Sequence, residues 1–223
     1  MMKRFLLVFC LLLVVCLGTY TCVDGKTYIY KETTGNNSMT TNLTQDDGLN
    51  DITISFSNNN ETHQLVCSKD YATKTWKYSN TTQGTAIEAE RAGDIIKLKG
   101  TLNKKEIQNN IKIDQAPWFE FIEVSLVNFL KSNDQTTAFW MIQPNNLKTY
   151  KMIAKKKNTE VITVNDQKIE AMKVTVTLQG FLSMFWSVNY WFRISDHTFV
   201  RYEGVRGGPG TPKTITQLLN ETN

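Results

Sequence analysis

The sequence predicts a mainly β protein: a strongly curved antiparallel sheet, or half-barrel, packed around one amphipathic helix. Residues 169–203 provide the first two observations. Apolar and polar side chains alternate over residues 172–178 and again over residues 186–194, as expected for strands with one buried face. The third observation is a single stretch of helical spacing, residues 117–131, whose bulky apolar side needs a cover. The concave side of a curved sheet would provide that cover.

The two alternating segments also assign side chains to faces. The first segment places on one face Met172, Val174, Val176 and Leu178. The second segment places on one face Trp186, Val188, Tyr190, Phe192 and Ile194. Trp191 points to the opposite face. A turn at Asp196 and His197 leads to a third strand at residues 199–203, so this region predicts the spine of an antiparallel sheet.

Shorter segments between Asn-, Asp- and Gly-rich turns predict the remaining strands. They cover residues 27–33, 52–56, 62–67, 73–78, 85–91, 95–98, 107–113, 138–142, 150–154 and 160–164. Residues 214–219 fit either a last short strand or a helical turn. Residues 34–50 are rich in Asn, Thr, Gly and Asp and have almost no apolar side chains, so they predict a long polar loop.

The predicted helix has one apolar and one polar side. Pro117 suits its first position, because the N–H that proline lacks would have no acceptor within the helix there. The apolar arc carries Trp118, Phe119, Ile122, Leu126, Phe129 and Leu130. The opposite side carries Glu120, Glu123, Asn128 and Lys131. We therefore expect Glu120 and Glu123 to face solvent, and we assign them no acid or base role.

Residues 1–18 predict a secretory signal. Lys3 and Arg4 precede an apolar run over residues 5–17, which is shorter than the roughly 20 residues of a membrane span. Cleavage near Gly18 would leave a single domain, residues 19–223, without a transmembrane segment and in a secreted or periplasmic location. An uncleaved membrane anchor is the alternative.

The roles expected for the cysteines and the glycosylation sequons depend on where the protein is located. Lipid attachment at Cys16 or Cys22 is a further alternative for the N-terminus. Cys22 and Cys67 remain after cleavage and could pair in an oxidising compartment, or one could be lipidated or buried and the other free. Glycosylation sequons, relevant only to a eukaryotic source, fall in predicted loops or the C-terminal tail at Asn36, Asn42, Asn60, Asn80 and Asn220.

The charge and the motifs argue against several functions. The formal net charge of +4 falls to +2 when Lys3 and Arg4 leave with the signal, which is too small to indicate nucleic-acid binding. His63 and His197 lie in no cluster with cysteines or carboxylates that could hold a metal. The triad residue types at residues 195–197 are adjacent in a turn and do not converge. We expect no catalytic residue, metal or cofactor and favour a non-enzymatic role.

The aromatic content suggests a binding surface. If helix and sheet face each other, they could enclose an apolar pocket for a lipid, an acyl chain or another apolar small molecule. Its predicted wall comprises Trp118, Phe119, Ile122, Leu126, Phe129, Trp186, Tyr190 and Phe192. Binding of an envelope or surface partner on the concave face is the related hypothesis. The alternatives are an interaction module with a solid core and a carboxylate-dependent hydrolase of envelope polymers. The sequence does not predict the oligomeric state.

Three segments carry a family resemblance: VNDQKIEAMKV, YWFRISDHTFVRYEG and GGPGTP. They resemble uncharacterised β-rich domains of bacterial exported proteins, over roughly residues 50–219. Such domains are loosely similar in fold to the half-barrel of periplasmic lipoprotein carriers. Asp166 stands where a glycine is usual in such a turn. The resemblance implies a fold and an exported location; it implies no active-site residue.

Overall fold

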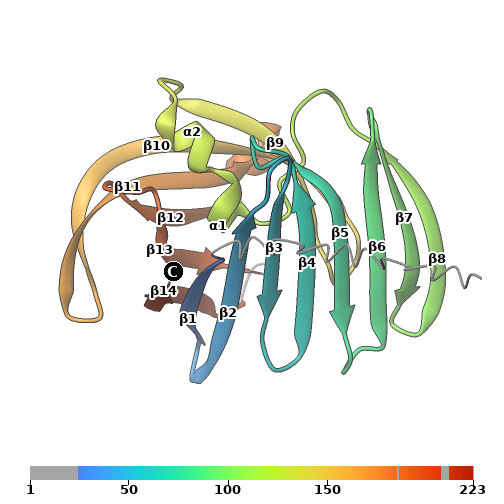
Figure 1. Ribbon diagram of the computed structural model, residues 1–223, viewed down its shortest axis with the longest axis horizontal. Coiled ribbons are helices and arrows are strands. Elements are labelled where there is room, and N and C mark those ends of the chain that lie inside the picture. The colour runs from blue at the N-terminus through green and yellow to red at the C-terminus, as the bar shows by residue number, and fades with distance from the viewer. Residues whose placement is uncertain (1–24, 185, 207–210, 223) are drawn as a thin grey trace, which may run out of the picture.

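Fourteen β-strands form one open antiparallel sheet in the computed structural model, which describes residues 25–184, 186–206 and 211–222 (Figure 1). The strands are β1 (Lys26–Thr34), β2 (Asn37–Asp47), β3 (Ile52–Ser57), β4 (Glu61–Cys67), β5 (Thr73–Asn80), β6 (Thr85–Ala92), β7 (Ile95–Leu102), β8 (Lys105–Lys112), β9 (Thr136–Ile142), β10 (Thr149–Val164), β11 (Gln167–Leu178), β12 (Ser187–Arg193), β13 (Phe199–Val205) and β14 (Lys213–Thr222). The helices in the same ranges are α1 (Ile122–Ser125), α2 (Val127–Lys131) and the 3-10 helix η1 (Gly180–Met184).

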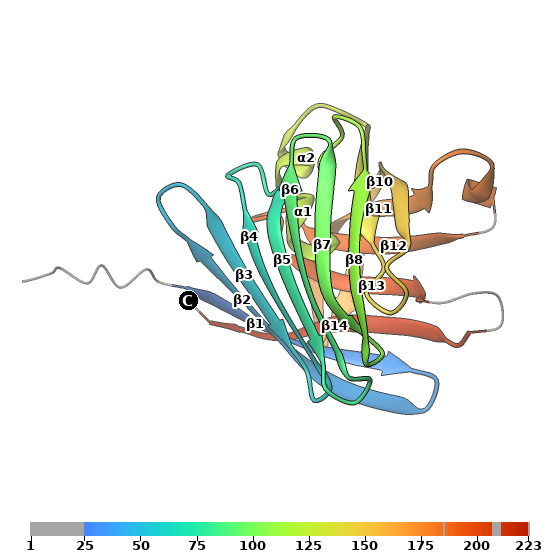
Figure 2. The same ribbon diagram turned by 90° about the vertical axis from the view of Figure 1, so that its right-hand side faces the viewer.

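The sheet consists of two meanders that meet at its centre. Strands β1 to β8 run outward to one edge, strands β9 to β14 return from the other edge, and β1 pairs with β14. The edge strands β8 and β9 do not pair with each other, so the sheet curves without closing. Figures 1 and 2 show it bent around α1 and α2. The predicted fold class, a strongly curved antiparallel sheet packed around a helical segment, is confirmed.

The register of β11 and β12 agrees with the predicted faces. Val174 pairs with Tyr190, and Val176 with Val188, and all four side chains are buried on the concave face. Trp191 lies on the opposite face, as predicted. Its ring is covered there by charged side chains, and its Nε1 donates a hydrogen bond of 2.5 Å to Glu160.

The long loop predicted for residues 34–50 is wrong, because β2 occupies most of it. Strand β2 pairs with β1 on one side and with β3 on the other. Its hydrogen bonds come from the backbone, which polar residues supply as well as apolar ones. Only Thr41 and Leu43 of this strand are buried, so the apolar pattern of a strand is almost missing from its sequence.

Residues 113–135, which we call the crossover, connect the two sheet edges across the concave side. The single helix predicted for residues 117–131 is shorter in the structure and divided into α1 and α2. Residues 117–119 are extended because their backbone groups bond to strands and are unavailable for helical bonds. Leu126, between α1 and α2, has φ −83° and ψ −1°, which interrupts the helix.

The concave face and the crossover share one hydrophobic core. Consecutive strands β2 to β7 contribute the fully buried side chains Leu43, Ile54, Leu65, Trp76, Ile87 and Leu98. Phe121 joins this half of the sheet to the crossover, with its ring centroid 5.0 Å from that of Phe56. No helix in the described ranges has the length and hydrophobicity needed to span a bilayer.

Gly100 in β7 is a position where the backbone requires glycine. Its φ is 137°, and a Cβ atom would lie 2.1 Å from the carbonyl oxygen of Ala86 in the neighbouring strand. We predict that Gly100→Ala lowers the free energy of unfolding by about 2 kcal/mol or more through strain and overlap. Gly93→Ala is the matched control: its φ is 65°, its Cβ would meet nothing within 4 Å, and the expected loss is about 1 kcal/mol. Equal losses in urea unfolding would contradict this account.

Candidate functional site

Residues 114–120, which we call the tie segment, fasten the crossover to strands of both meanders. Phe119 N donates to Trp140 O, and Trp140 N donates to Pro117 O, each at 2.8 Å. Trp140 belongs to the edge strand β9. On the other side, Thr73 N at the start of β5 donates to Trp118 O at 2.8 Å. The tie segment therefore covers the β9 edge and links it to β5.

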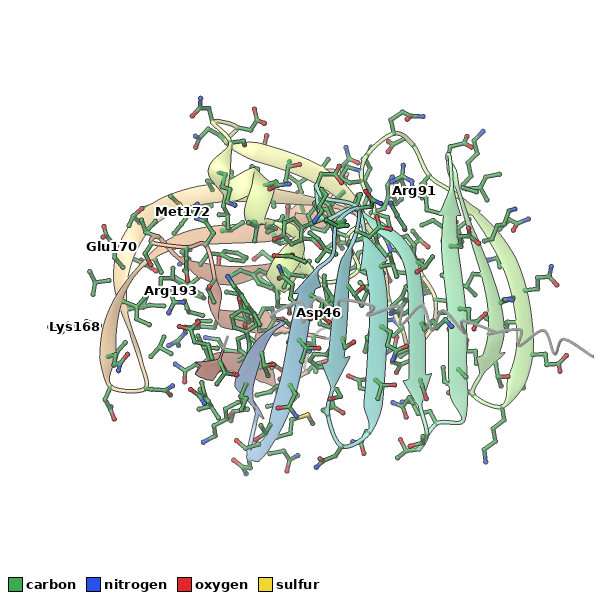
Figure 3. The ribbon with its side chains drawn as sticks, viewed as in Figure 1. Asp46, Arg91, Lys168, Glu170, Met172 and Arg193 are labelled. Atoms are coloured by element: carbon green, nitrogen blue, oxygen red, sulfur yellow. The ribbon has the colours of Figure 1, made fainter. Side chains whose placement is uncertain are left out.

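Charged side chains hold the beginning of the tie segment. Arg91 of β6, labelled in Figure 3, donates to Asp114 O at 3.2 Å and to Ala116 O at 3.0 Å. The Asp114 carboxylate accepts hydrogen bonds from Lys151 Nζ and from Trp140 Nε1, which come from β10 and β9. These two bonds lower the pKa of Asp114 to about 2. Asp114 is therefore ionised at neutral pH and joins the tie segment to the second meander.

Glu120 ends the tie segment as a buried carboxyl group. It is 8% exposed, and its Oε2 accepts hydrogen bonds from Trp118 Nε1 at 2.8 Å and from Ile142 N at 3.1 Å. Burial raises the pKa of Glu120 well above its ordinary value, and the two hydrogen bonds offset this only in part. The prediction that Glu120 faces solvent is therefore wrong: it lies in the non-helical segment before Ile122, the first residue of α1.

The predicted ligand wall lies between the crossover and the concave face, and its side chains pack against one another. Seven of its members are buried: Trp118, Phe119, Ile122, Leu126, Phe129, Tyr190 and Phe192. The Phe119 ring centroid is 5.3 Å from that of Phe139, and Lys156 Nζ lies 4.8 Å from the centre of the Phe129 ring. Trp186 is half-buried and donates to Val205 O at 3.0 Å. The structure thus gathers seven of the eight predicted residues, but as a packed interior.

The best-formed depressions of the described residues lie elsewhere and are shallow. One is on the convex face of β5, β6 and β7 and includes the exposed charges of Lys77, Glu88 and Lys99. The other is lined by residues of β1 and β2 and by Asn59. Neither touches the predicted wall.

A group of polar side chains, which we call the Arg206 cluster, lies on the concave side of the sheet. Its residues come from α1, β1 and β12, and from β13 and the residue that follows it. The cluster comprises Glu32, Glu123, Tyr190, Tyr202 and Arg206. The Arg206 guanidinium is 2.9 Å from the Glu32 carboxylate and 5.1 Å from the centre of the Tyr202 ring. Burial raises the pKa of Glu123, while Arg206 lowers it. Glu123 is half-buried, so the prediction of a solvent-facing side chain is wrong for this residue as well.

The Arg206 cluster brings two carboxylates to one guanidinium, which neutralises charge in a partly buried place. Two converging carboxylates are also a requirement of glycoside chemistry. However, Glu32 is already ion-paired, and the best-formed depressions of the described residues lie away from this cluster. The geometry therefore fits a structural ion-pair network better than an open catalytic cleft.

The histidines have local roles. His63 is buried, and its Nδ1 accepts a hydrogen bond of 3.1 Å from Trp76 Nε1. Burial, assisted by the charge of Arg206, lowers the pKa of His63 to about 3, so the ring is neutral at neutral pH. Asp196 accepts bonds from Arg193 and Thr198, not from a histidine. Within the described ranges no group of histidines, cysteines and carboxylates could hold a metal ion.

The predicted signal and Cys22 lie outside the described residues, so export and the Cys22–Cys67 disulfide stay predictions. Cys67 is buried, and burial raises the pKa of its thiol to about 11. Among the sequons, Asn36 and Asn60 are exposed in turns.

The loop or tail assignment of the other sequons is wrong, because Asn42, Asn80 and Asn220 belong to strands. Asn80 is also 7% exposed, and its side-chain oxygen accepts bonds from Thr82 and Gln83.

Sequence reasoning missed the residues that organise this region, namely Glu32, Arg91, Asp114, Glu120, Glu123 and Arg206. Their partners are distant in sequence: Arg91 reaches Asp114, and Arg206 reaches Glu32. Pro117 and Trp118, which lie between Asp114 and Glu120, fit a helix equally well. No local pattern in the chain distinguishes the two cases.

Comparison with known proteins supports the fold alone. No family model and no curated protein matches the sequence. One similar solved structure is described as the crystal structure of a beta-barrel-like protein of the domain of unknown function DUF1849 from Brucella abortus. The match has a TM-score of 0.61 and 8% sequence identity, and it covers 89% of this chain and 97% of that chain. The similarity therefore supports a β-rich, barrel-like fold.

The buried Glu120 makes a testable contribution to stability. Because its pKa is raised in the folded protein, the native state retains a proton that the unfolded chain loses above about pH 4.3. Stability therefore falls as the pH rises from that value toward the folded-state pKa. Glu120→Gln keeps an oxygen acceptor for Trp118 and Ile142 but cannot ionise. We predict that it is more stable relative to the native protein at pH 8 than at pH 5, measured by urea unfolding.

Two further variants control this prediction. Glu120→Ala removes the acceptor and should cost about 1–3 kcal/mol, because buried N–H groups lose their partner. Glu90→Gln, on the exposed side of β6, should leave the pH dependence unchanged. A pH-independent difference between Glu120→Gln and the native protein would contradict the assignment.

Proposed function

We propose that this protein is an exported, non-enzymatic interaction module that contacts a partner at the cell envelope or cell surface with its outer surface. The interior of the curved sheet is then a structural core. One observation carries this proposal: the side chains that could have lined a ligand pocket are packed between the crossover and the sheet. Leu126 and Phe192 are both 0% exposed, so the space that a ligand would need is filled.

The chemistry of the interior supports the same conclusion. The ionisable groups near the concave face are compensated by one another, as in the Arg206 cluster, or are held in hydrogen bonds, as in Glu120. Ionisable groups held in this way stabilise a fixed structure, whereas a general acid or base must reach a substrate. The exported location rests on the predicted signal at residues 1–18.

Binding of an acyl chain beneath α1 and α2 is the competing function. It would require the crossover helices to leave the concave face. Neither helix has a side-chain cap, but polar contacts hold α2 at both ends: Asn128 Nδ2 donates to Lys69 O at 3.3 Å, and Lys156 Nζ to Ser132 O at 2.6 Å. The two functions differ in one measurable property, the response of stability to an apolar ligand.

We predict that excess long-chain fatty acid leaves the Tm of the protein unchanged. A ligand that binds only the folded state would stabilise it by about 2.7 kcal/mol at a hundredfold excess over its Kd. A Tm that rises with fatty-acid concentration would therefore overturn the solid interior in favour of the ligand site.

The core role of Leu126 gives a second test. Leu126 is 0% exposed, so Leu126→Ala should lower the free energy of unfolding by about 2–5 kcal/mol through the cavity that it creates. Leu219→Ala is the matched control on β14. That side chain is 41% exposed, and its loss should cost less than about 1 kcal/mol. If Leu126→Ala costs no more than the control, the junction of α1 and α2 is not part of a solid core.

A further inference from the structure

The tip of the β11–β12 hairpin exposes large apolar side chains. It consists of η1, which Figure 2 shows projecting beyond the ends of the neighbouring strands. Phe181 is 73% exposed and Met184 is 70% exposed. These two residues are separated by one turn of the 3-10 helix, so they lie on the same side of it. The sheet behind the tip is rigid, since β11 pairs with both β10 and β12.

Charge is absent from this part of the chain. Residues 174–192 contain no Asp, Glu, Lys or Arg, although 21% of the whole sequence is charged. The η1 helix and both strand ends that support it lie inside this interval. Exposed turns usually carry polar or charged residues. The composition of the tip therefore fits an environment in which charge is unfavourable.

An indole and two lysines lie beside the tip. Trp186 follows η1, is half-buried and anchors its indole N–H on Val205 O at 3.0 Å. Lys213 lies across from Val205 in the sheet, and Lys148 is exposed just before β10, whose Lys151 O accepts a bond from Gln179 N beside η1. Exposed apolar side chains flanked by an indole and by cations are a combination that the interface of a bilayer accepts.

The small size of the patch favours a lipid surface over a folded protein partner. A stable protein interface buries about 800 Å² on each partner and usually has a central apolar cluster with a polar rim. A one-turn protrusion with two exposed apolar side chains offers much less contact area. The same side chains need no complementary surface to enter the apolar boundary of a bilayer, where binding follows buried apolar area.

We propose that the η1 tip inserts Phe181 and Met184 into the boundary of a lipid bilayer and docks the domain reversibly on a membrane. This inference rests on the proposed function, because it identifies the envelope partner as the lipid surface itself. Of the two nearby lysines, Lys213 is already paired with Glu203, which leaves it less charge to offer a lipid headgroup. Binding should therefore depend on apolar insertion more than on lipid charge.

Co-sedimentation of the full-length mature protein with lipid vesicles tests the proposal. We expect binding to phosphatidylcholine vesicles, and at most a modest increase when phosphatidylglycerol is added. The double variant Phe181→Ser/Met184→Ser should reduce the bound fraction at least about tenfold, because both inserted side chains are lost. The control Leu49→Ser/Val161→Ser removes side chains that are 98% and 65% exposed elsewhere on the molecule, and it should bind like the native protein.

Several results would overturn the proposal. The first is that the native protein binds neither kind of vesicle. This result overturns the proposal also if the tip is found to bind a protein instead. The second is binding to phosphatidylglycerol vesicles that the tip variant does not reduce, which would indicate a purely electrostatic contact. The third is equal loss in both double variants, which would indicate non-specific adsorption. Unchanged urea unfolding of the tip variant excludes a folding defect, and the fatty-acid test of the interior is independent of all three.

Discussion

The structure depends on the hydrogen bonds that attach the tie segment to strands of both meanders. An open sheet of this curvature has two edges that do not pair, and exposed edges favour association with other chains. Residues 117–119 cover the β9 edge with backbone hydrogen bonds to Trp140, and Trp118 O bonds to Thr73 of β5. The link also fixes where the crossover enters the concave side. From there Phe121 and Phe129 reach the core, so the packing of α1 and α2 follows from the tie segment.

The buried ionisable groups of this core oppose each other in their effect on stability. His63 has a lowered folded-state pKa, so its contribution is complete above about pH 6.5 and is lost as the pH falls through that value toward 3. Glu120 has a raised pKa, so its contribution weakens as the pH rises. Burial favours the neutral form of both groups, and each accepts a hydrogen bond from an indole N–H, His63 from Trp76 and Glu120 from Trp118. The two groups therefore lower the stability of the fold at opposite ends of the pH range.

Much of the sheet could be predicted from the sequence, because alternation reports directly on a strand with one buried face. The pairs Val174–Tyr190 and Val176–Val188 follow that alternation. Strand β2 could not be predicted, since it buries only Thr41 and Leu43 and obtains its remaining stability from backbone bonds. The helix predicted for the tie segment was wrong for another reason. Its apolar spacing fits a helix, and the partners that make it extended are supplied by distant strands.

The candidate site also depends on contacts between distant parts of the chain, which local sequence patterns do not predict. Seven of the eight side chains predicted as a ligand wall, all but Trp186, are buried together, because large apolar residues on facing elements must be buried somewhere. Sequence reasoning could not decide whether they enclose a space or fill one, since that depends on packing in three dimensions. Because the interior is filled, the exposed apolar residues are the better candidates for contacts with other molecules. A side chain such as Phe181, which is 73% exposed, leaves most of its apolar surface outside the core, as expected for a surface that meets another molecule.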